Sequence, residues 1–250
     1  MGSERCAVLL HGFGADRLGW AFNRKALEAL ADVAVPDLPG HGEAVDDFRD
    51  GGRETLLTQI EEMVTKHAGE RKVTLFGHSL GGGLALGFAE RNPDRVDGLF
   101  LIAPVGLGRG ISRGFLRGFS VLTDSPAARE AFAKLVANPE RITDMMVARA
   151  LEQLDRPGAR AALVAISERL LEEEDAYRSA AATVAEAGIR RTVVWGEDDR
   201  INRFDEAVTE RFGGETHMIA GTGHLPHMEK AAAVTGLMMT FLQQDPTSSG

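Results

Sequence analysis

A strand–turn–helix pattern at residues 73–85 constrains the fold of this chain more than any other feature. Residues 73–76 (Val-Thr-Leu-Phe) are an apolar run typical of a buried strand, and the small residues beginning at Gly82 predict a helix. The pentapeptide between them, Gly-His-Ser-Leu-Gly at 77–81, favours a tight turn, because glycines at both flanks remove Cβ atoms that would clash there. The pattern predicts a nucleophile elbow that presents Ser79 to solvent.

A second glycine-flanked loop follows the first apolar run of the chain. Residues 6–10 (Cys-Ala-Val-Leu-Leu) predict a short buried strand, which ends in His-Gly-Phe-Gly at 11–14. Such a loop leaves backbone N–H groups uncovered. We expect the N–H of Phe13 and that of Leu80, the residue after Ser79, to point at one oxygen and form an oxyanion hole. The ring of Phe13 would line the acyl pocket.

Acidic residues and a histidine follow two later strand-like runs. Glu-Asp-Asp at 197–199 comes after Thr-Val-Val-Trp at 192–195, and His224 comes after Thr-His-Met-Ile at 216–219. Serine, then acid, then histidine is the order that a catalytic triad follows on this strand pattern. Only one carboxylate can hold the imidazole, and these residues alone leave Glu197, Asp198 and Asp199 open.

The base that activates Ser79 is expected to be His224. A serine hydroxyl is a poor nucleophile near neutral pH and needs a base within about 2.6–3.2 Å. His224 follows Gly223 directly after a strand, whereas His227 follows a proline at a predicted helix start. We therefore expect His224 to be the base and His227 a structural neighbour.

The motifs of the chain, in order, resemble those of the α/β-hydrolase superfamily over nearly the whole length. The matching segments are His-Gly-Phe-Gly at 11–14, Asp-Leu-Pro-Gly-His-Gly at 37–42, Gly-His-Ser-Leu-Gly-Gly at 77–82, Trp-Gly-Glu-Asp-Asp at 195–199 and Gly-His-Leu-Pro-His-Met-Glu at 223–229. Within the superfamily, residues 11–16, 37–43, 93–96 and 102–108 resemble the catalytic domain of acetoin-dehydrogenase-type dihydrolipoyl acetyltransferases.

The resemblance implies a role for several of these positions. Its Gly-x-x-Asp spacing selects Asp199 as the acid of the triad, with Asp198 as the fallback. It makes His11 and His41 loop-organising residues, and it makes His78 a packing neighbour of the elbow that borders the substrate site. No metal site is expected, because a metal needs three or four convergent ligands.

The chain departs from the family pattern in two places. Only about ten residues precede the His-Gly loop, where family members commonly carry a β-hairpin, so we expect a sheet shorter by two strands. Arg203 stands where a proline often follows the Trp-Gly-x-x-Asp motif. This second departure weakens the local match of that loop.

The remaining pattern predicts an α/β fold with a mostly parallel central sheet and helices on both faces. Strand signals at 6–10, 33–35, 73–76, 98–102, 192–195 and 216–219 alternate with helical segments near 20–30, 54–67, 79 onwards and 230–242. Strand signals disappear between residues 106 and 187, where helical periodicity predicts an inserted cap. Residues 1–105 and 188–245 would form the core, and 246–250 a disordered tail.

Composition excludes several classes of protein. A net charge of −9 disfavours nucleic acid and anionic membranes as partners, since binding phosphates needs clustered cations. No apolar run approaches the roughly 18 residues of a membrane span, and we expect no secretory signal before the first strand. Cys6, the single cysteine, is expected to be a small buried hydrophobe. The cytoplasm is the expected compartment.

The predicted cap carries two further patterns, each with two interpretations. Arg109, Arg113 and Arg117 recur every four residues, which could form a basic stripe for a carboxylate or for coenzyme A phosphates. A solvated helix face is the favoured interpretation. Met145 and Met146 could adapt to an acyl chain, although methionines at such positions are more often core residues.

Two hypotheses of function follow. In the first, a serine hydrolase cleaves an ester or thioester of a small acyl substrate through Ser79, Asp199 and His224, and no cofactor is needed. In the second, the resemblance implies an acyltransferase, with a thiol of coenzyme A or of a lipoyl protein in place of water. The first is the simpler interpretation, because no lysine follows an aspartate as in a typical lipoyl turn. A ligand sensor that retains the triad ranks last.

Overall fold

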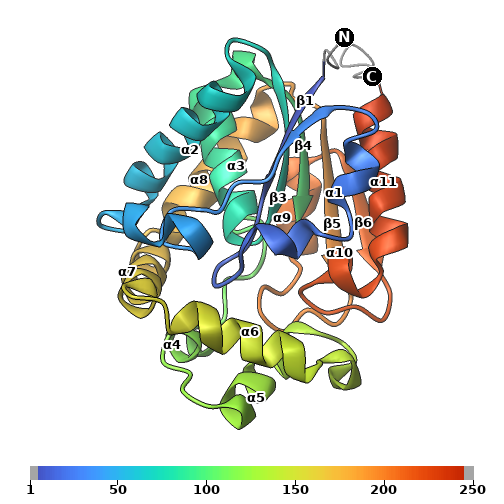
Figure 1. Cartoon of the computed structure of the whole chain (residues 1–250). Coiled ribbons are helices and arrows are strands. Elements are labelled where there is room, and N and C mark those ends of the chain that lie inside the picture. Colours follow the sequence, from blue (N-terminus) through green and yellow to red (C-terminus); the bar gives the residue numbers. More distant parts are fainter. Residues whose placement is uncertain (1–4, 245–250) are drawn as a thin grey trace.

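Six parallel strands form one sheet in the computed structural model, which describes residues 5–244 (Figure 1). They are β1 (Cys6–Leu10), β2 (Asp32–Ala34), β3 (Val73–His78), β4 (Val96–Ile102), β5 (Arg191–Gly196) and β6 (Glu215–Ile219), in the order β2-β1-β3-β4-β5-β6. Each neighbouring pair is parallel. The α/β fold expected from the sequence is therefore confirmed. The tail expected at 246–250 lies outside the described residues.

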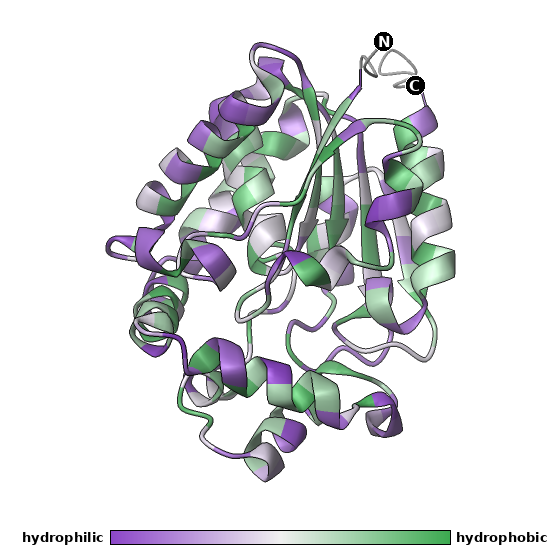
Figure 2. Ribbon diagram, viewed as in Figure 1, coloured by the Kyte–Doolittle hydropathy of each residue, from purple (hydrophilic) through white to green (hydrophobic). Residues whose placement is uncertain are grey.

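The sheet is buried on both faces because alternate side chains of its central strands enter different apolar clusters. In β1, Val8 and Leu10 belong to one cluster, and Ala7 and Leu9 belong to the other. The first cluster is covered by α2 (Arg53–Ala68), α3 (Leu80–Arg91), α8 (Glu174–Glu186) and α9 (Glu206–Phe212), the second by α1 (Arg24–Leu27) and α11 (Ala231–Gln243). Figure 2 shows hydrophilic residues along the outer side of α2, whereas α11 is mostly hydrophobic or neutral in colour.

The helix expected near residues 20–30 is wrong in its extent. The chain instead forms a 3-10 turn, η1 (Arg17–Trp20), and then the short α1. Between them lies Asn23, whose side-chain amide donates to the hydroxyl of Thr235 at 2.8 Å and to the carbonyl of His227 at 3.2 Å. These buried bonds fix a turn at Asn23, and the turn interrupts the helical periodicity.

The chain between β4 and β5 forms helices at the carboxyl end of the sheet (Figure 1). They are α4 (Arg113–Phe119), α5 (Ser125–Leu135), α6 (Asp144–Leu154) and α7 (Ala159–Glu172), followed by α8. The short elements elsewhere are η2 (Gly42–Phe48), η3 (Pro93–Arg95), η4 (Pro139–Arg141) and α10 (Pro226–Glu229). We propose that α4 to α7 form the cap expected between residues 106 and 187. Helix α8 lies in the same range but packs against α3, so it would belong to the core.

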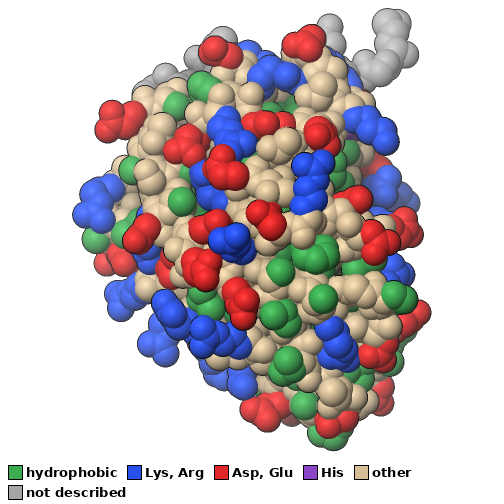
Figure 3. All heavy atoms as spheres, turned by 90° about the vertical axis from the view of Figure 1, so that its left-hand side faces the viewer, with side chains coloured by type: hydrophobic (Ala, Val, Ile, Leu, Met, Phe, Trp, Pro, Cys, Tyr) green, Lys and Arg blue, Asp and Glu red, His purple; other side chains and the backbone are tan. Residues whose placement is uncertain are grey.

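Acidic and basic side chains are interspersed on the face of the molecule that carries α2 and α7 (Figure 3). The structure also contains ion pairs between charged side chains, such as Arg71 with Asp32 at 2.8 Å and Arg91 with Glu61 at 3.5 Å. Within residues 5–244, none of the helices combines the length and the apolar character that crossing a membrane requires.

We expect Gly81→Ala to lower the free energy of unfolding by about 1–3 kcal/mol. A Cβ at Gly81 would lie 2.3 Å from the carbonyl oxygen of Leu10 and 2.5 Å from that of His11, and neither backbone atom can move without displacing the end of β1. The control is Gly236→Ala in α11, where no atom lies within 4 Å. It should raise the free energy of unfolding by up to about 1 kcal/mol. Urea titration followed by circular dichroism measures both, and equal stabilities would contradict the close approach.

Candidate active site

Ser79 occupies a strained turn between β3 and α3. Its backbone φ is 51° and its ψ is −113°, in the region that favours glycine. The turn is held by two backbone hydrogen bonds: the N–H of Ser79 donates to Ile102 at 2.9 Å, and its carbonyl accepts from Val105 at 3.0 Å. At Gly77 a Cβ would lie 2.6 Å from the Cα of Gly82, so only glycine fits there. Ser79 thus lies at the carboxyl end of the sheet, but it is only 6% exposed, so the prediction that the turn presents it to solvent is wrong: it lines a cleft instead.

His224 and Asp199 meet beyond the ends of β6 and β5. Nδ1 of His224 lies 2.8 Å from Oδ2 of Asp199, and both residues are buried. Because an ionised carboxylate only accepts hydrogen bonds, Nδ1 is the donor, and Nε2 is left to accept a proton. The other oxygen, Oδ1, accepts the N–H groups of Ile201 at 2.8 Å and Asn202 at 3.0 Å. The carboxylate is therefore fixed on both sides.

Ser79 and His224 line the same cleft. Within the described range, no hydrogen bond reaches the hydroxyl of Ser79. The two other acids left open by the sequence, Glu197 and Asp198, are exposed and contribute nothing to the cleft lining. Ser79, Asp199 and His224 thus all lie at the carboxyl end of the sheet, and Asp199 and His224 are hydrogen-bonded to each other.

The loop after β1 approaches the serine turn closely. A Cβ at Gly12 would lie 2.7 Å from Nδ1 of His78 and 3.3 Å from the Cβ of Ser79. Phe13 lines the cleft, and its N–H, like that of Leu80 at the start of α3, donates to no group in residues 5–244. Free N–H groups at a helix start attract negative charge. Both donors are therefore left without a partner within the described chain.

His78 holds the backbone of the histidine loop. Its Nε2 donates to the carbonyl of His224 at 2.9 Å, and its ring lies 4.6 Å from that of His227. Burial, together with the two neighbouring imidazoles, keeps the pKa of His78 well below its ordinary value. A neutral His78 therefore borders the cleft and supports the peptide of His224.

The histidines that the resemblance treats as loop-organising make loop contacts. Nε2 of His11 accepts the N–H of Leu38 at 2.9 Å, and its Nδ1 donates to the carbonyl of Gly12 at 2.9 Å. Nδ1 of His41 donates to the carbonyl of Pro39 at 3.0 Å, and burial lowers the pKa of His41 to about 3. Both rings are neutral and organise the loop: they pack against each other, and the ring of His41 packs against that of Phe13.

The cleft is mainly apolar and is roofed by α4, α5 and α6. Its apolar lining includes Phe13, Ile111, Phe115, Leu116, Phe119, Phe132, Leu135, Met146, Leu170, Ile201 and Met228. The lining also holds Arg149 of α6, which forms an ion pair with Asp16 at 2.5 Å. Neither residue was singled out from the sequence, because each becomes a cleft residue only through the contact between α6 and the loop after β1.

The two cap patterns have different outcomes. Arg109, Arg113 and Arg117 are exposed and do not line the cleft, which favours a solvated face. Met146 lines the cleft, whereas Met145 is 77% exposed. Of these residues, only Met146 can contact a substrate in the cleft.

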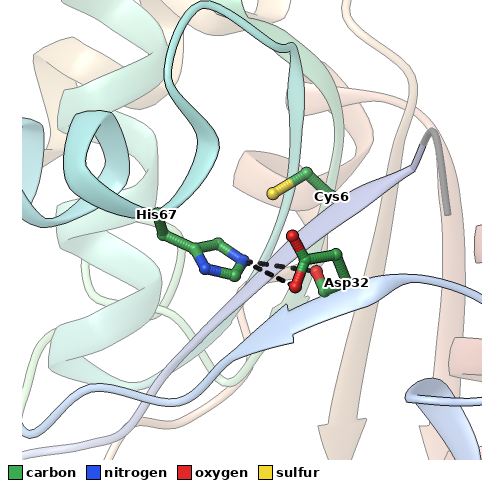
Figure 4. Close-up of side chains that lie close together, drawn as sticks. All are labelled: Cys6, Asp32 and His67. Atoms are coloured by element: carbon green, nitrogen blue, oxygen red, sulfur yellow. Dashed lines mark hydrogen bonds and ion pairs between the residues drawn. The ribbon is translucent and has the colours of Figure 1, made fainter. Parts of the chain in front are cut away.

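One cluster of possible metal ligands lies at the opposite end of the sheet, where β1 and β2 begin. Ligand atoms of Cys6, Asp32 and His67 lie within 4.8 Å of one another (Figure 4). Arg71 already donates to the carboxylate of Asp32 at 2.8 Å and is also bonded to the carbonyl of His67 at 3.2 Å. A cation bound there would have to displace Arg71, so this geometry is that of an ion-pair cluster.

Comparison with known proteins adds sequence relatives. The profile of the family described as "Alpha/beta hydrolase family" matches residues 7–237. A dihydrolipoyllysine-residue acetyltransferase component of the acetoin cleaving system is 34% identical in Pseudomonas putida and 30% in Cupriavidus necator, over 95% and 96% of this chain. The chain spans only 63% and 64% of the lengths of these two relatives. A 2-hydroxy-6-oxononadienedioate/2-hydroxy-6-oxononatrienedioate hydrolase of Escherichia coli is 27% identical and is covered over 87% of its length.

Solved structures share the fold. A meta-cleavage product hydrolase from Pseudomonas fluorescens IP01 superimposes with a TM-score of 0.85 at 19% identity, covering 96% of this chain and 91% of that one. The 2-hydroxy-6-oxo-6-phenylhexa-2,4-dienoate hydrolase of Rhodococcus sp. strain RHA1 also gives 0.85, at 22% identity and with 97% and 92% coverage. At these identities the likeness concerns the fold alone.

We expect the protein to lose stability as the pH falls from about 6.5 toward 3, because burial lowers the pKa of His227 to about 3. The folded state binds fewer protons than the unfolded chain in that window, so each such histidine steepens the loss by up to about 1.4 kcal/mol per pH unit. Replacing His227 with Phe should flatten the slope by that amount. Its Nδ1 has no partner in the described chain, and its ring packs on Trp20. Urea titrations at pH 8 and pH 5 give the free energy of unfolding of the wild type and of His227→Phe. An equal loss of this free energy between the two pH values in both proteins would contradict the prediction.

Proposed function

The chain belongs to the alpha/beta hydrolase family, and from that premise we propose that it is a serine hydrolase acting on an ester or thioester of a small acyl substrate. The position of Ser79 carries the proposal. This strained residue at the head of α3 shares a cleft with an imidazole that is already bonded to a buried carboxylate. A serine nucleophile, its base and the group that orients the base are the parts that acyl transfer requires.

In this proposal the oxygen of Ser79 attacks the acyl carbon while Nε2 of His224 takes the hydroxyl proton. The carbonyl electron pair moves onto the acyl oxygen, and the N–H groups of Phe13 and Leu80 stabilise it. Collapse of the intermediate breaks the bond to the leaving group, which receives the proton from His224. Water then attacks the acyl-Ser79 ester by the same route and releases the acid. Asp199 keeps Nδ1 protonated throughout and stabilises the imidazolium.

The lining of the cleft supports an apolar acyl group as the substrate portion that binds beneath α4–α6. Aromatic rings of Phe13, Phe115 and Phe119 lie on this side, and apolar surface gains about 25 cal/mol for each Å² removed from water. The reaction uses no cofactor in this scheme. A cytoplasmic location, expected from the sequence, remains a prediction.

An acyltransferase is the second candidate, because the P. putida and C. necator relatives carry an acetyltransferase name. The same acyl-enzyme would then be attacked by a thiol of coenzyme A or of a dihydrolipoyl group on a partner protein. The thiol sulfur forms the new bond to the acyl carbon, His224 takes the thiol proton, and Ser79 leaves with it.

Replacing Ser79 with Ala should reduce hydrolysis of short p-nitrophenyl esters to the uncatalysed background, because no hydroxyl remains to form the acyl-enzyme. The circular dichroism spectrum should stay unchanged. A fluorophosphonate probe should label the wild type at Ser79 and should leave the variant unlabelled. Undiminished turnover by Ser79→Ala would refute the assignment of the nucleophile.

A matched pair of variants tests the acid. We expect Asp199→Asn to lower kcat by roughly 10⁴-fold, because an amide no longer enforces the required imidazole tautomer. The neighbouring Asp198→Asn, at an exposed position, should leave kcat unchanged. An equal change in kcat for the two variants would contradict the assignment of Asp199 as the acid.

The two candidate functions differ in the acceptor. With acetyl-coenzyme A as donor, a hydrolase releases acetate at the same rate whether or not dihydrolipoamide is present. An acyltransferase would form acetyl-dihydrolipoamide faster than acetate. Separation of the two products by mass spectrometry decides between them, and dominant thiol transfer would reverse our ranking.

A further inference from the structure

The carboxylate of Glu229 joins two segments that lie far apart in the sequence. Its Oε1 accepts the N–H of Gly223, the residue before His224, at 2.7 Å. Its Oε2 accepts the N–H of Ala137, which follows α5, at 2.8 Å. Hydrogen bonds in which an ionised carboxylate accepts are stronger than neutral ones. Glu229 therefore ties the loop of the proposed base to the helical segment that roofs the cleft.

Further contacts reinforce the same junction. The N–H of His224 donates to the carbonyl of Leu135 at 2.7 Å, and the guanidinium of Arg141 donates to the carbonyl of Glu229 at 2.6 Å. A Cβ at Gly223 would lie 2.6 Å from the carbonyl oxygen of Leu135, so the two backbones are in direct contact. The segment 135–141 and the loop 223–229 consequently form one hydrogen-bonded unit.

This unit determines where the imidazole of His224 lies. The peptide groups of His224 are held on one side by Leu135 and on the other by His78. Since Leu135 also lines the cleft, a movement of the roof displaces the same backbone that carries the base. Displacements of about 1 Å in a catalytic group can cost about 100-fold in rate.

We propose that Glu229 is a positioning residue. It couples the packing of segment 135–141 against the core to the position of His224 relative to Asp199 and Ser79. The proposal rests on the function proposed above. Glu229 itself touches neither the reacting hydroxyl nor the ring of His224. It acts through Gly223 on one side and through Ala137 on the other.

The test compares Glu229→Ala and Glu229→Gln with Glu152→Gln, a matched change at an exposed position of α6. Alanine removes both acceptors, and glutamine keeps one. On p-nitrophenyl acetate we expect kcat to fall about 10- to 100-fold in Glu229→Ala, with KM little changed. The kcat of Glu229→Gln should lie between those of Glu229→Ala and the wild type, and the kcat of Glu152→Gln should equal that of the wild type. Rates are expressed per folded molecule after thermal unfolding has been measured for each variant.

A second readout needs no turnover. Proton NMR of a histidine hydrogen-bonded to a carboxylate gives a far-downfield Nδ1–H signal. In a Ser79→Ala background this signal should persist with Glu152→Gln and disappear or shift with Glu229→Ala. A lowered melting temperature with unchanged kcat per folded molecule and an unchanged NMR signal would reduce Glu229 to a structural role and overturn the proposal. If Ser79→Ala retains activity while Glu229→Ala still alters the signal, the proposed chemistry fails and the coupling stands.

Discussion

The cleft depends on the close approach of two backbones where β1 and β3 end. Gly81, in the first turn of α3, donates its N–H to the carbonyl of His11 at 3.1 Å, and no side chain fits between them. From β1 the chain continues to β2 on one side, and from β3 it continues to β4 on the other, so the strand order reverses between β1 and β3. The loops after these two strands leave in opposite directions and open a crevice between them. The contact at Gly81 therefore sets Ser79 and the loop of Phe13 against each other within that crevice.

Short-range patterns were sufficient to predict the sheet and to locate the candidate site residues, because turn glycines and apolar runs act over a few neighbouring residues. The turn around Ser79 and the position of His224 could be located in this way, whereas the choice of Asp199 among three neighbouring acids needed the resemblance to a known family. Pairings over long distances could not. Ala137 and Glu229 are 92 residues apart, and neither local sequence identifies the other as a partner. The expected helix near 20–30 failed for the same reason, since the partner of Asn23 lies 212 residues away.

The electrostatics of the cleft separate one histidine from its neighbours. His11, His41, His78 and His227 are all buried, and burial lowers the pKa of each. Their packing around the serine turn gives a rigid, neutral environment. Among the buried histidines of residues 5–244, only His224 is hydrogen-bonded to a carboxylate. In the proposed reaction, a proton taken from Ser79 would therefore have one site at which a counter-ion is already in place.

In the proposed chemistry water and a thiol would attack the same acyl-enzyme, so access to the cleft would decide which of them reacts. Water enters through any gap, whereas a thiol on a long arm needs an entry path that stays open after the acyl group has filled the apolar side. The contacts that hold the roof include the ion pair of Arg149 with Asp16, the junction at Glu229 and the hydrogen bond from the N–H of Ser112 to the carbonyl of Ile201. Opening at Glu229 would loosen the backbone of His224 at the same moment. The contact on the Arg149 side involves side chains alone, so loosening it would leave the hydrogen bonds of the His224 backbone intact.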